Sequence, residues 1–327
     1  MFNLSQSKAV ILSVKGTALS EGERSFFASA RPLGFILFAR NCEAPAQVAS
    51  LAAELREVVG WHCPVLIDQE GGRVQRLKPP VWRQYAPMKS FGKRAEQGDL
   101  DGALSDLRFS ILQLAEELVE AGVDVNCAPV MDVLSAVTHD VIGDRAFSEE
   151  PDVVARMGES VCRNFLSAGV VPVIKHLPGH GRGAVDSHKD LPHVSENIDE
   201  LIVADFEPFR SVSKIFGQAI WGMVAHIVYD AIDPAHPSSV SPTIIKDVIR
   251  GDIGFDGFLL SDDLDMEALA GYGDVGGRAA ACLAAGCDAA LYCAGELDVM
   301  EGLIKSVPNL SASAQKRLQN SYLPLKA

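Results

Sequence analysis

The chain has 327 residues, of which 48% are hydrophobic and 22% charged, and its formal net charge is −14 at pH 7. This composition is typical of a globular protein. The acidic balance and the lack of a lysine- or arginine-rich run exclude nucleic acid as an expected partner. No apolar stretch approaches the roughly 20 residues that a bilayer-spanning helix needs.

The cysteines and the N-terminal residues indicate a cytoplasmic protein. The seven cysteines are scattered, odd in number and form no C-x-x-C pair, which is typical of reduced core thiols rather than of disulfides or a zinc site. Residues 1–8 lack the basic and apolar order of a signal peptide. We therefore expect no membrane contact and a cytoplasmic location.

Short apolar segments alternate with segments of helical periodicity along the chain. The predicted strands are residues 9–14, 34–38, 64–68, 123–130, 170–174, 219–225, 257–260 and 289–293. The predicted helices are residues 19–30, 45–59, 104–121, 151–168, 198–211, 241–250, 276–285, 296–306 and 311–322. A long loop that holds several prolines is expected over residues 77–90.

Eight strands that alternate with helices predict parallel βαβ units in an α/β protein. The number eight favours a (β/α)8 barrel of the TIM type over an open sheet, and the length fits one such domain over residues 1–327. No G-x-G-x-x-G follows the first strand and no G-x-x-x-x-G-K-[ST] occurs. Nucleotide-binding α/β folds therefore lose their main support.

Polar side chains follow the predicted strands at the end where barrel enzymes carry their active sites. In chain order, they are Asp68, Glu70, Asp132, Arg145, Lys175, His176, Asp186, His188, His226, Asp262 and Asp263. They are densest in residues 173–188, where prolines and glycines end a buried strand and open a loop with three histidines. We expect these side chains to share one face of the barrel, and catalysis to take place there.

Two of these groups have the chemistry of a catalytic pair, and each has a structural alternative. Asp262 is either a nucleophile aimed at a ligand or a helix cap; Asp263 can take the capping role and leave Asp262 facing the barrel axis. In Asp186-Ser-His188, the carboxylate can orient the imidazole and raise its pKa, which suits a proton donor and acceptor near neutral pH. The alternative is an ordinary histidine of a surface loop.

The remaining cations and histidines also allow more than one interpretation. Lys175 and Arg145 are expected to donate hydrogen bonds to substrate oxygens, and the alternative is ion pairing with the neighbouring acids. His176 and His180 are four residues apart, but a proline and a glycine between them exclude the helical pair that a zinc protease uses. We therefore expect no metal.

Five segments together resemble glycoside hydrolase family 3, and within it the single-domain bacterial β-N-acetylglucosaminidases that recycle peptidoglycan. The segments are IDQEGGRVQR at residues 67–76, GDRAF at 143–147, KHLPGHG at 175–181, DSH at 186–188 and SDDL at 261–264. Each motif is short, but all five occur in the order of the family and spread over most of the predicted barrel.

The resemblance implies a retaining hydrolase without a cofactor, acting on a small carbohydrate. It implies that Asp262 is the nucleophile and that His188, assisted by Asp186, is the acid/base, on a loop to which the glycines of residues 179–183 give freedom. It further implies that the terminal N-acetylglucosamine is held by Asp68, Arg76, Arg145, Lys175 and His176. The implied substrate is a muropeptide of the N-acetylglucosaminyl-1,6-anhydro-N-acetylmuramic acid type.

Other functions remain open at this point. A phosphorylase or a β-glucosidase would belong to the same family. Phosphorolysis is open because a neutral histidine does not repel phosphate as a glutamate would. A metal-dependent barrel hydrolase would use the histidines instead. A catalytically silent sugar-binding protein is the alternative outside the enzymes.

Overall fold

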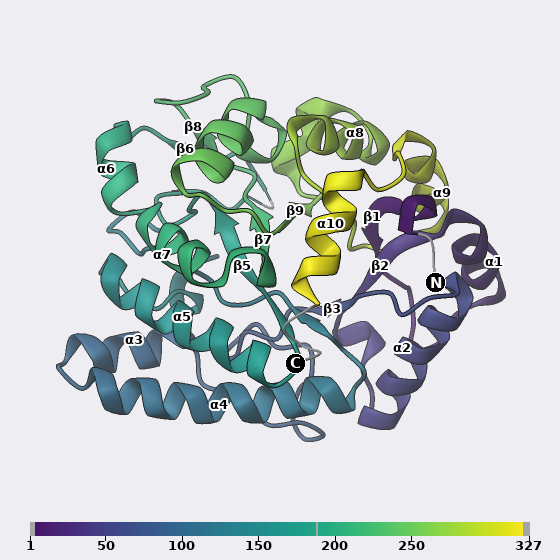
Figure 1. Ribbon diagram of the computed structural model, residues 1–327, viewed down its shortest axis with the longest axis horizontal. Helices are drawn as coiled ribbons and strands as arrows, with labels where there is room; N and C mark the ends of the chain where they lie inside the picture. Colours follow the sequence, from purple (N-terminus) through teal and green to yellow (C-terminus); the bar gives the residue numbers. More distant parts are fainter. Residues whose placement is uncertain (1–3, 188, 323–327) are drawn as a thin grey trace.

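The computed structural model describes residues 4–187 and 189–322, which contain a closed barrel of eight parallel strands (Figure 1). Around the barrel the strands follow the order β1-β10-β9-β7-β5-β4-β3-β2. Their bounds are β1 Lys8–Leu12, β2 Pro32–Leu37, β3 Val65–Ile67, β4 Val125–Asn126, β5 Val171–Leu177, β7 Trp221–Val224, β9 Phe258–Asp263 and β10 Ala289–Leu291. The predicted (β/α)8 architecture is confirmed.

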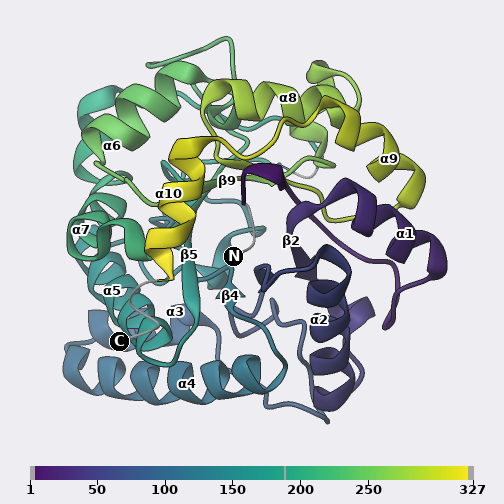
Figure 2. The same cartoon turned by 45° about the vertical axis from the view of Figure 1, so that its right-hand side comes forward.

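Helices surround this barrel and connect its strands (Figures 1 and 2). They are α1 Glu21–Ala30, α2 Pro45–Val59, α3 Met88–Glu96, α4 Leu100–Glu120, α5 Pro151–Ser167, α6 Ile198–Val203, α7 Glu207–Phe216, the π-helix η6 Ile244–Asp252, α8 Val275–Ala285, α9 Leu297–Ser306 and α10 Ala312–Ser321. Helix α10 reaches the N-terminal end of β7, where the indole of Trp221 donates to Ser321 Oγ at 2.9 Å. This end of the barrel is therefore covered, and the opposite end is left for a site.

The burial pattern explains why these segments take these forms. All six residues of β2 and all seven of β5 are buried, as expected for parallel strands covered by helices outside and filled by side chains inside. In α4, Leu107, Ile111, Leu114 and Leu118 are buried at helical spacing and form the face that packs on the barrel.

Three parts of the structure differ from the sequence prediction. The helix predicted over residues 198–211 is two helices, α6 and α7, and Pro208 stands in the first turn of α7, where a proline is tolerated. The predicted strand at residues 123–130 shortens to β4, although backbone hydrogen bonds between residues 127–129 and the neighbouring strands continue beyond it. Helix α3 was not predicted at all, since its buried residues are few and follow the long loop.

A second, two-stranded parallel sheet pairs β6 His193–Val194 with β8 Val228–Tyr229 outside the barrel. It joins the chain that follows β5 to the chain that follows β7. Hydrophobic periodicity does not predict this sheet, because each strand has only two residues. Among the described residues, 4–187 and 189–322, no helix combines the length and the apolarity that crossing a membrane requires.

Candidate active site

A cavity of about 280 Å³ opens at the C-terminal ends of the barrel strands. Its polar lining residues are Asp68, Glu70, Arg73, Arg76, Arg145, Lys175, His176, His180, Ser187, Asp262 and Asp263. Its apolar or weakly polar lining residues are Ile36, Phe38, Val74, Val141, Ile142, Met223, Leu291 and Cys293. The volume is close to the lower end of the range for ligand pockets, roughly 300–1,000 Å³, and suits one sugar ring.

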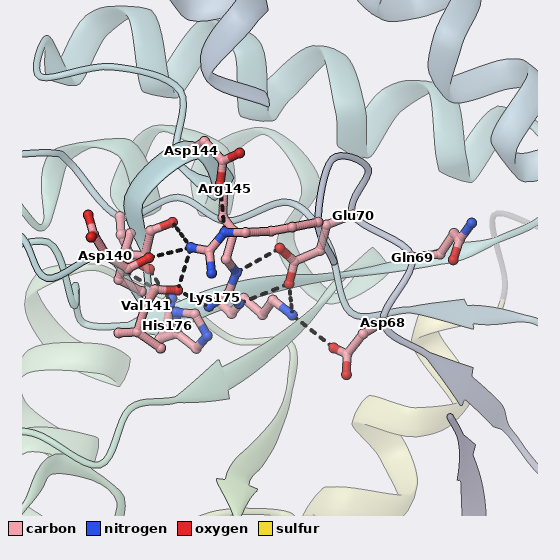
Figure 3. Close-up of polar contacts among 12 residues, drawn as sticks. Asp68, Gln69, Glu70, Asp140, Val141, Asp144, Arg145, Lys175 and His176 are labelled. Atoms are coloured by element: carbon pink, nitrogen blue, oxygen red, sulfur yellow. Dashed lines mark hydrogen bonds and ion pairs between the residues drawn. The ribbon is translucent and has the colours of Figure 1, made fainter. Parts of the chain in front are cut away.

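An ion cluster forms one wall of the cavity (Figure 3). The Lys175 ammonium lies 2.9 Å from an oxygen of Asp68 and 2.6 Å from one of Glu70. Arg145 donates two hydrogen bonds to Glu70, at 2.8 and 2.9 Å, and Arg76 donates one to Asp68 at 3.0 Å. Of the two interpretations open for Lys175 and Arg145, the structure contains the pairing with acids. A contact with substrate stays a prediction.

The charges of this cluster are fixed by their mutual contacts. Burial alone would raise the pKa of Asp68, but Lys175 and Arg76 hold it far below its usual range. Burial would also raise the pKa of Glu70, but Arg145 and Lys175 hold it below its usual value. For Lys175, burial lowers the pKa but the two carboxylates raise it well above its usual value. All three groups are therefore charged at neutral pH.

A buried carboxylate orients His176. One oxygen of Asp132 accepts the backbone N–H groups of His176, at 3.1 Å, and His180, at 2.7 Å, and the other lies 2.7 Å from Nδ1 of His176. Burial raises the pKa of Asp132 but His176 lowers it, to about 2. Because the ionised carboxylate accepts a hydrogen bond from Nδ1–H of His176, Nε2 of the same ring is left available to a ligand in the cavity.

The two adjacent acids at the end of β9 have opposite pKa shifts. Burial raises the pKa of Asp262, but His176 and His226 outweigh it and the net pKa is below the usual value. For Asp263 burial dominates and raises the pKa to about 6. Oδ1 of Asp263 accepts the backbone N–H groups of Asp265 and Cys293. Among residues 4–187 and 189–322, Asp262 forms no ion pair, whereas the ion-cluster acids are all paired.

The loop that follows β5 is packed tightly at its glycines. A Cβ on Gly181 would lie 1.7 Å from the carbonyl oxygen of Val133, and one on Gly183 would lie 2.8 Å from the His180 ring. Residues 179–181 and Gly183 are buried. The absence of a side chain therefore allows close packing here, and movement of the loop stays a prediction.

The structure places the sequence-predicted residues unequally. Asp262 and all five predicted sugar-binding residues line the cavity. Asp186 does not line it, although the next residue, Ser187, does and is buried. The predicted acid/base, His188, lies outside the described residues.

Other polar residues at this end of the barrel had no role assigned from the sequence. Glu70 was expected on this face and lines the cavity beside Asp68. His180 is buried, lines the cavity and has no hydrogen-bond partner for either ring nitrogen among the described residues; burial lowers its pKa to about 4. Both nitrogens of His226 are engaged, by Ser239 and by a backbone carbonyl. Within the part of the chain that the structure describes, no three His, Cys, Asp or Glu side chains are grouped as metal ligands.

Comparisons with known proteins add the following findings. The profile described as "Glycosyl hydrolase family 3 N terminal domain" matches residues 7–322. A beta-hexosaminidase of Nitrosomonas eutropha is 38% identical over 87% of this chain and 80% of its own. NagZ from Neisseria gonorrhoeae, solved in complex with N-trifluoroacetyl-D-glucosamine, is 30% identical with a TM-score of 0.87, over 98% of this chain and 93% of that one. A glycoside hydrolase family 3 beta-N-acetylglucosaminidase from Paenibacillus has the same TM-score at 29% identity; this chain spans 62% of it.

Proposed function

This chain belongs to glycosyl hydrolase family 3, and on that basis we propose that it is a retaining, exo-acting β-N-acetylglucosaminidase. The observation that carries the proposal is the state of Asp262, an ionised carboxylate that lines the cavity and is neutralised by no cation in the described part of the chain. A carboxylate in that state suits a nucleophile, because it stabilises an oxocarbenium-like centre and then forms an ester with it.

The sugar in the cavity is proposed to be one terminal N-acetylglucosamine. The groups proposed to hold its hydroxyls are Asp68, Arg76, Arg145, Lys175 and His176, all of which line the cavity. Fixed charges in a sheltered site bind hydroxyls in a defined orientation without reorganising during the reaction. The relative solved in complex with N-trifluoroacetyl-D-glucosamine supports an N-acylated sugar as the ligand.

The proposed reaction follows the two-step route of retaining glycosidases. Asp262 attacks the anomeric carbon while His188 protonates the leaving oxygen, and the glycosidic bond breaks as the glycosyl ester forms. His188, now neutral, takes a proton from water, which attacks the same carbon and releases Asp262. Asp186 is proposed to raise the basicity of His188. No cofactor takes part in these steps.

The proposed substrate class is a muropeptide of the N-acetylglucosaminyl-1,6-anhydro-N-acetylmuramic acid type, and the proposed setting is cell-wall recycling in the cytoplasm. The support for this is the sequence resemblance, together with scattered cysteines that are typical of a reducing compartment.

The test is nitrophenol release from the β-N-acetylglucosaminide and the β-glucoside, side by side, with EDTA and with or without phosphate. We expect strong preference for the N-acetyl sugar and free N-acetylglucosamine as product, with the β-anomer formed first by NMR. A sugar phosphate would make the protein a phosphorylase, and activity on the glucoside alone would make it a β-glucosidase. Loss of activity with EDTA would favour a metal enzyme, and binding without turnover a sugar-binding protein.

The residue roles have a separate test. His188→Ala is expected to slow hydrolysis of glycosides with poor leaving groups far more than that of the nitrophenyl glycoside, because only the former need a proton on the leaving oxygen. Equal losses on both substrates would contradict the acid/base role. Asp262→Ala is expected to remove turnover on both.

A further inference from the structure

The base of the loop after β5 contains a cation that binds two separate parts of the chain. Nε of Arg182 donates to Oδ2 of Asp205 at 2.7 Å, and Nη1 donates to Oε1 of Glu196 at 3.1 Å. Glu196 precedes α6 and Asp205 follows it. Arg182 therefore ties both ends of the α6 segment to the loop that carries Asp186.

The pair between Arg182 and Glu196 closes the chain into a ring. The residues between them, 183–195, include Asp186 and Ser187, and Ser187 lines the cavity. Holding the two ends of a segment together removes most of the conformations open to it. The ion pair therefore limits where the segment with Asp186 can lie relative to the cavity.

The chain on the N-terminal side of this ring is held by further contacts. The hydroxyl of Tyr229, a buried residue of β8, donates to the carbonyl oxygen of Gly179. The carbonyl of Gly181 accepts from Ser135 and Thr138, in the loop after β4. Arg182 thus projects from a fixed base, and its ion pairs act together with the pairing of β6 with β8 to hold the ring.

The surroundings of this ion pair suit a role in conformation rather than in stability. The side chain of Asp205 is only 2% exposed, and burial raises its pKa to about 6 although Arg182 lowers it. The free-energy cost of removing two charges from water offsets much of the gain from their attraction. The best-attested role of a buried ion pair is therefore to fix one arrangement of the chain.

We propose that Arg182, through Asp205 and Glu196, is a positioning residue for proton transfer, which holds the described residues on either side of position 188 next to the cavity. This inference rests on the proposed function, because the proton donor, His188, belongs to the 183–195 segment. Arg182 itself does not line the cavity, so it acts on the reaction only through the segment.

The test compares leaving groups in the full chain. Arg182→Met is expected to lower kcat/KM at least tenfold for phenyl or alkyl β-N-acetylglucosaminides, and less than threefold for the nitrophenyl glycoside. Glu196→Ala opens the ring but keeps the buried pair between Arg182 and Asp205. It should shift the ratio of kcat/KM values for the two kinds of leaving group in the same direction, and it keeps the test available if Arg182→Met does not fold. If Arg182 had only a structural role, the substitution would lower kcat/KM equally for both kinds of substrate.

The chain offers a matched control at the opposite end of the barrel. Arg317 donates to the buried Asp288 at 2.8 Å and has the same side-chain exposure as Arg182, 22%. It also lies 3.6 Å from a second, more exposed carboxylate, that of Asp256. Arg317→Met is therefore expected to change stability without changing the ratio of the two substrates.

The reference variant separates this inference from the proposed function. If His188→Ala changes the leaving-group ratio but Arg182→Met and Glu196→Ala leave it at the wild-type value, the positioning role is overturned and the proposed function stands. If His188→Ala leaves the ratio unchanged, the acid/base role falls, and the positioning role falls with it.

Discussion

Lys175→Met is the sharpest test of the ion cluster, because it removes one charge from the barrel interior and keeps the length of the side chain. The side chain of Lys175 is 3% exposed, and its ammonium bridges two carboxylates, at 2.9 Å from Asp68 and 2.6 Å from Glu70. After the substitution each carboxylate keeps one guanidinium, that of Arg76 or Arg145. The variant therefore has two buried acids that are incompletely neutralised.

The expected loss of stability follows from this geometry. Removing one partner of a buried ion pair costs roughly 3–5 kcal/mol, and the remaining guanidiniums place this case at the lower end, about 3 kcal/mol. At roughly 2–4 °C per kcal/mol, Tm should fall by about 6–12 °C. Lys15→Met is the control: Lys15 pairs with Glu296 at the surface, and such a pair contributes under about 1 kcal/mol.

The pH dependence of this loss has a definite sign. The pKa values of Asp68 and Glu70 are lowered in the folded protein, so their stabilising effect is present above the unfolded pKa of about 4 and is lost as the pH falls below it. The deficit of Lys175→Met should thus be full at pH 7 and shrink below pH 4, measured by urea unfolding. If the free energy of unfolding of Lys175→Met at pH 7 were less than about 1 kcal/mol below that of the wild type, or if this difference grew on acidification, the reasoning would be refuted.

Three further substitutions test other contacts. Asp132→Asn should lower kcat/KM on the nitrophenyl glycoside by roughly ten- to a hundredfold, because it removes a charge-assisted hydrogen bond to His176. The circular dichroism spectrum should stay unchanged, and unchanged kinetics would contradict the prediction. Gly181→Ala should lower the free energy of unfolding by about 3 kcal/mol or more, since the methyl group overlaps the carbonyl of Val133; an unshifted urea midpoint would show that the loop yields. Asp263 has a pKa raised to about 6, so its ionisation destabilises the fold above pH 6 and has no effect below pH 4. Asp263→Asn should accordingly gain about 2–3 kcal/mol at pH 8 and nothing at pH 4, and an equal change at both would argue against burial of the charge.

The barrel and the family could be predicted from sequence because both leave repeated signals. Eight apolar segments alternating with helices predict parallel strands, and the family that the five short motifs indicate is confirmed by the match over residues 7–322. Element ends were less predictable. The break between α6 and α7 and the shortness of β4 are features that hydrophobic periodicity does not record.

For the candidate site, the sequence predicted which residues gather but not how they bind one another. Strand ends identified Lys175 and Arg145, yet whether these cations face acids or an open cavity depends on distances across the barrel. The close packing of the glycines of residues 179–183 was not predicted, for a related reason. Glycine gives freedom in an exposed loop and allows close approach in a buried one, and only the position of Val133 and its neighbours distinguishes the two.

The adjacent acids of β9 show why identity alone could not assign the nucleophile. Asp262 and Asp263 are the same residue type one position apart, and both line the cavity. The imidazoles of His176 and His226 lower the pKa of the first, while burial raises that of the second to about 6. A nucleophile must be ionised at the working pH, which the lowered pKa of Asp262 favours over a wider pH range than the raised pKa of Asp263. Asp263 also accepts two backbone N–H groups, whereas Asp262 accepts one. The surroundings of each acid, rather than the carboxyl group itself, therefore favour Asp262 as the attacking group.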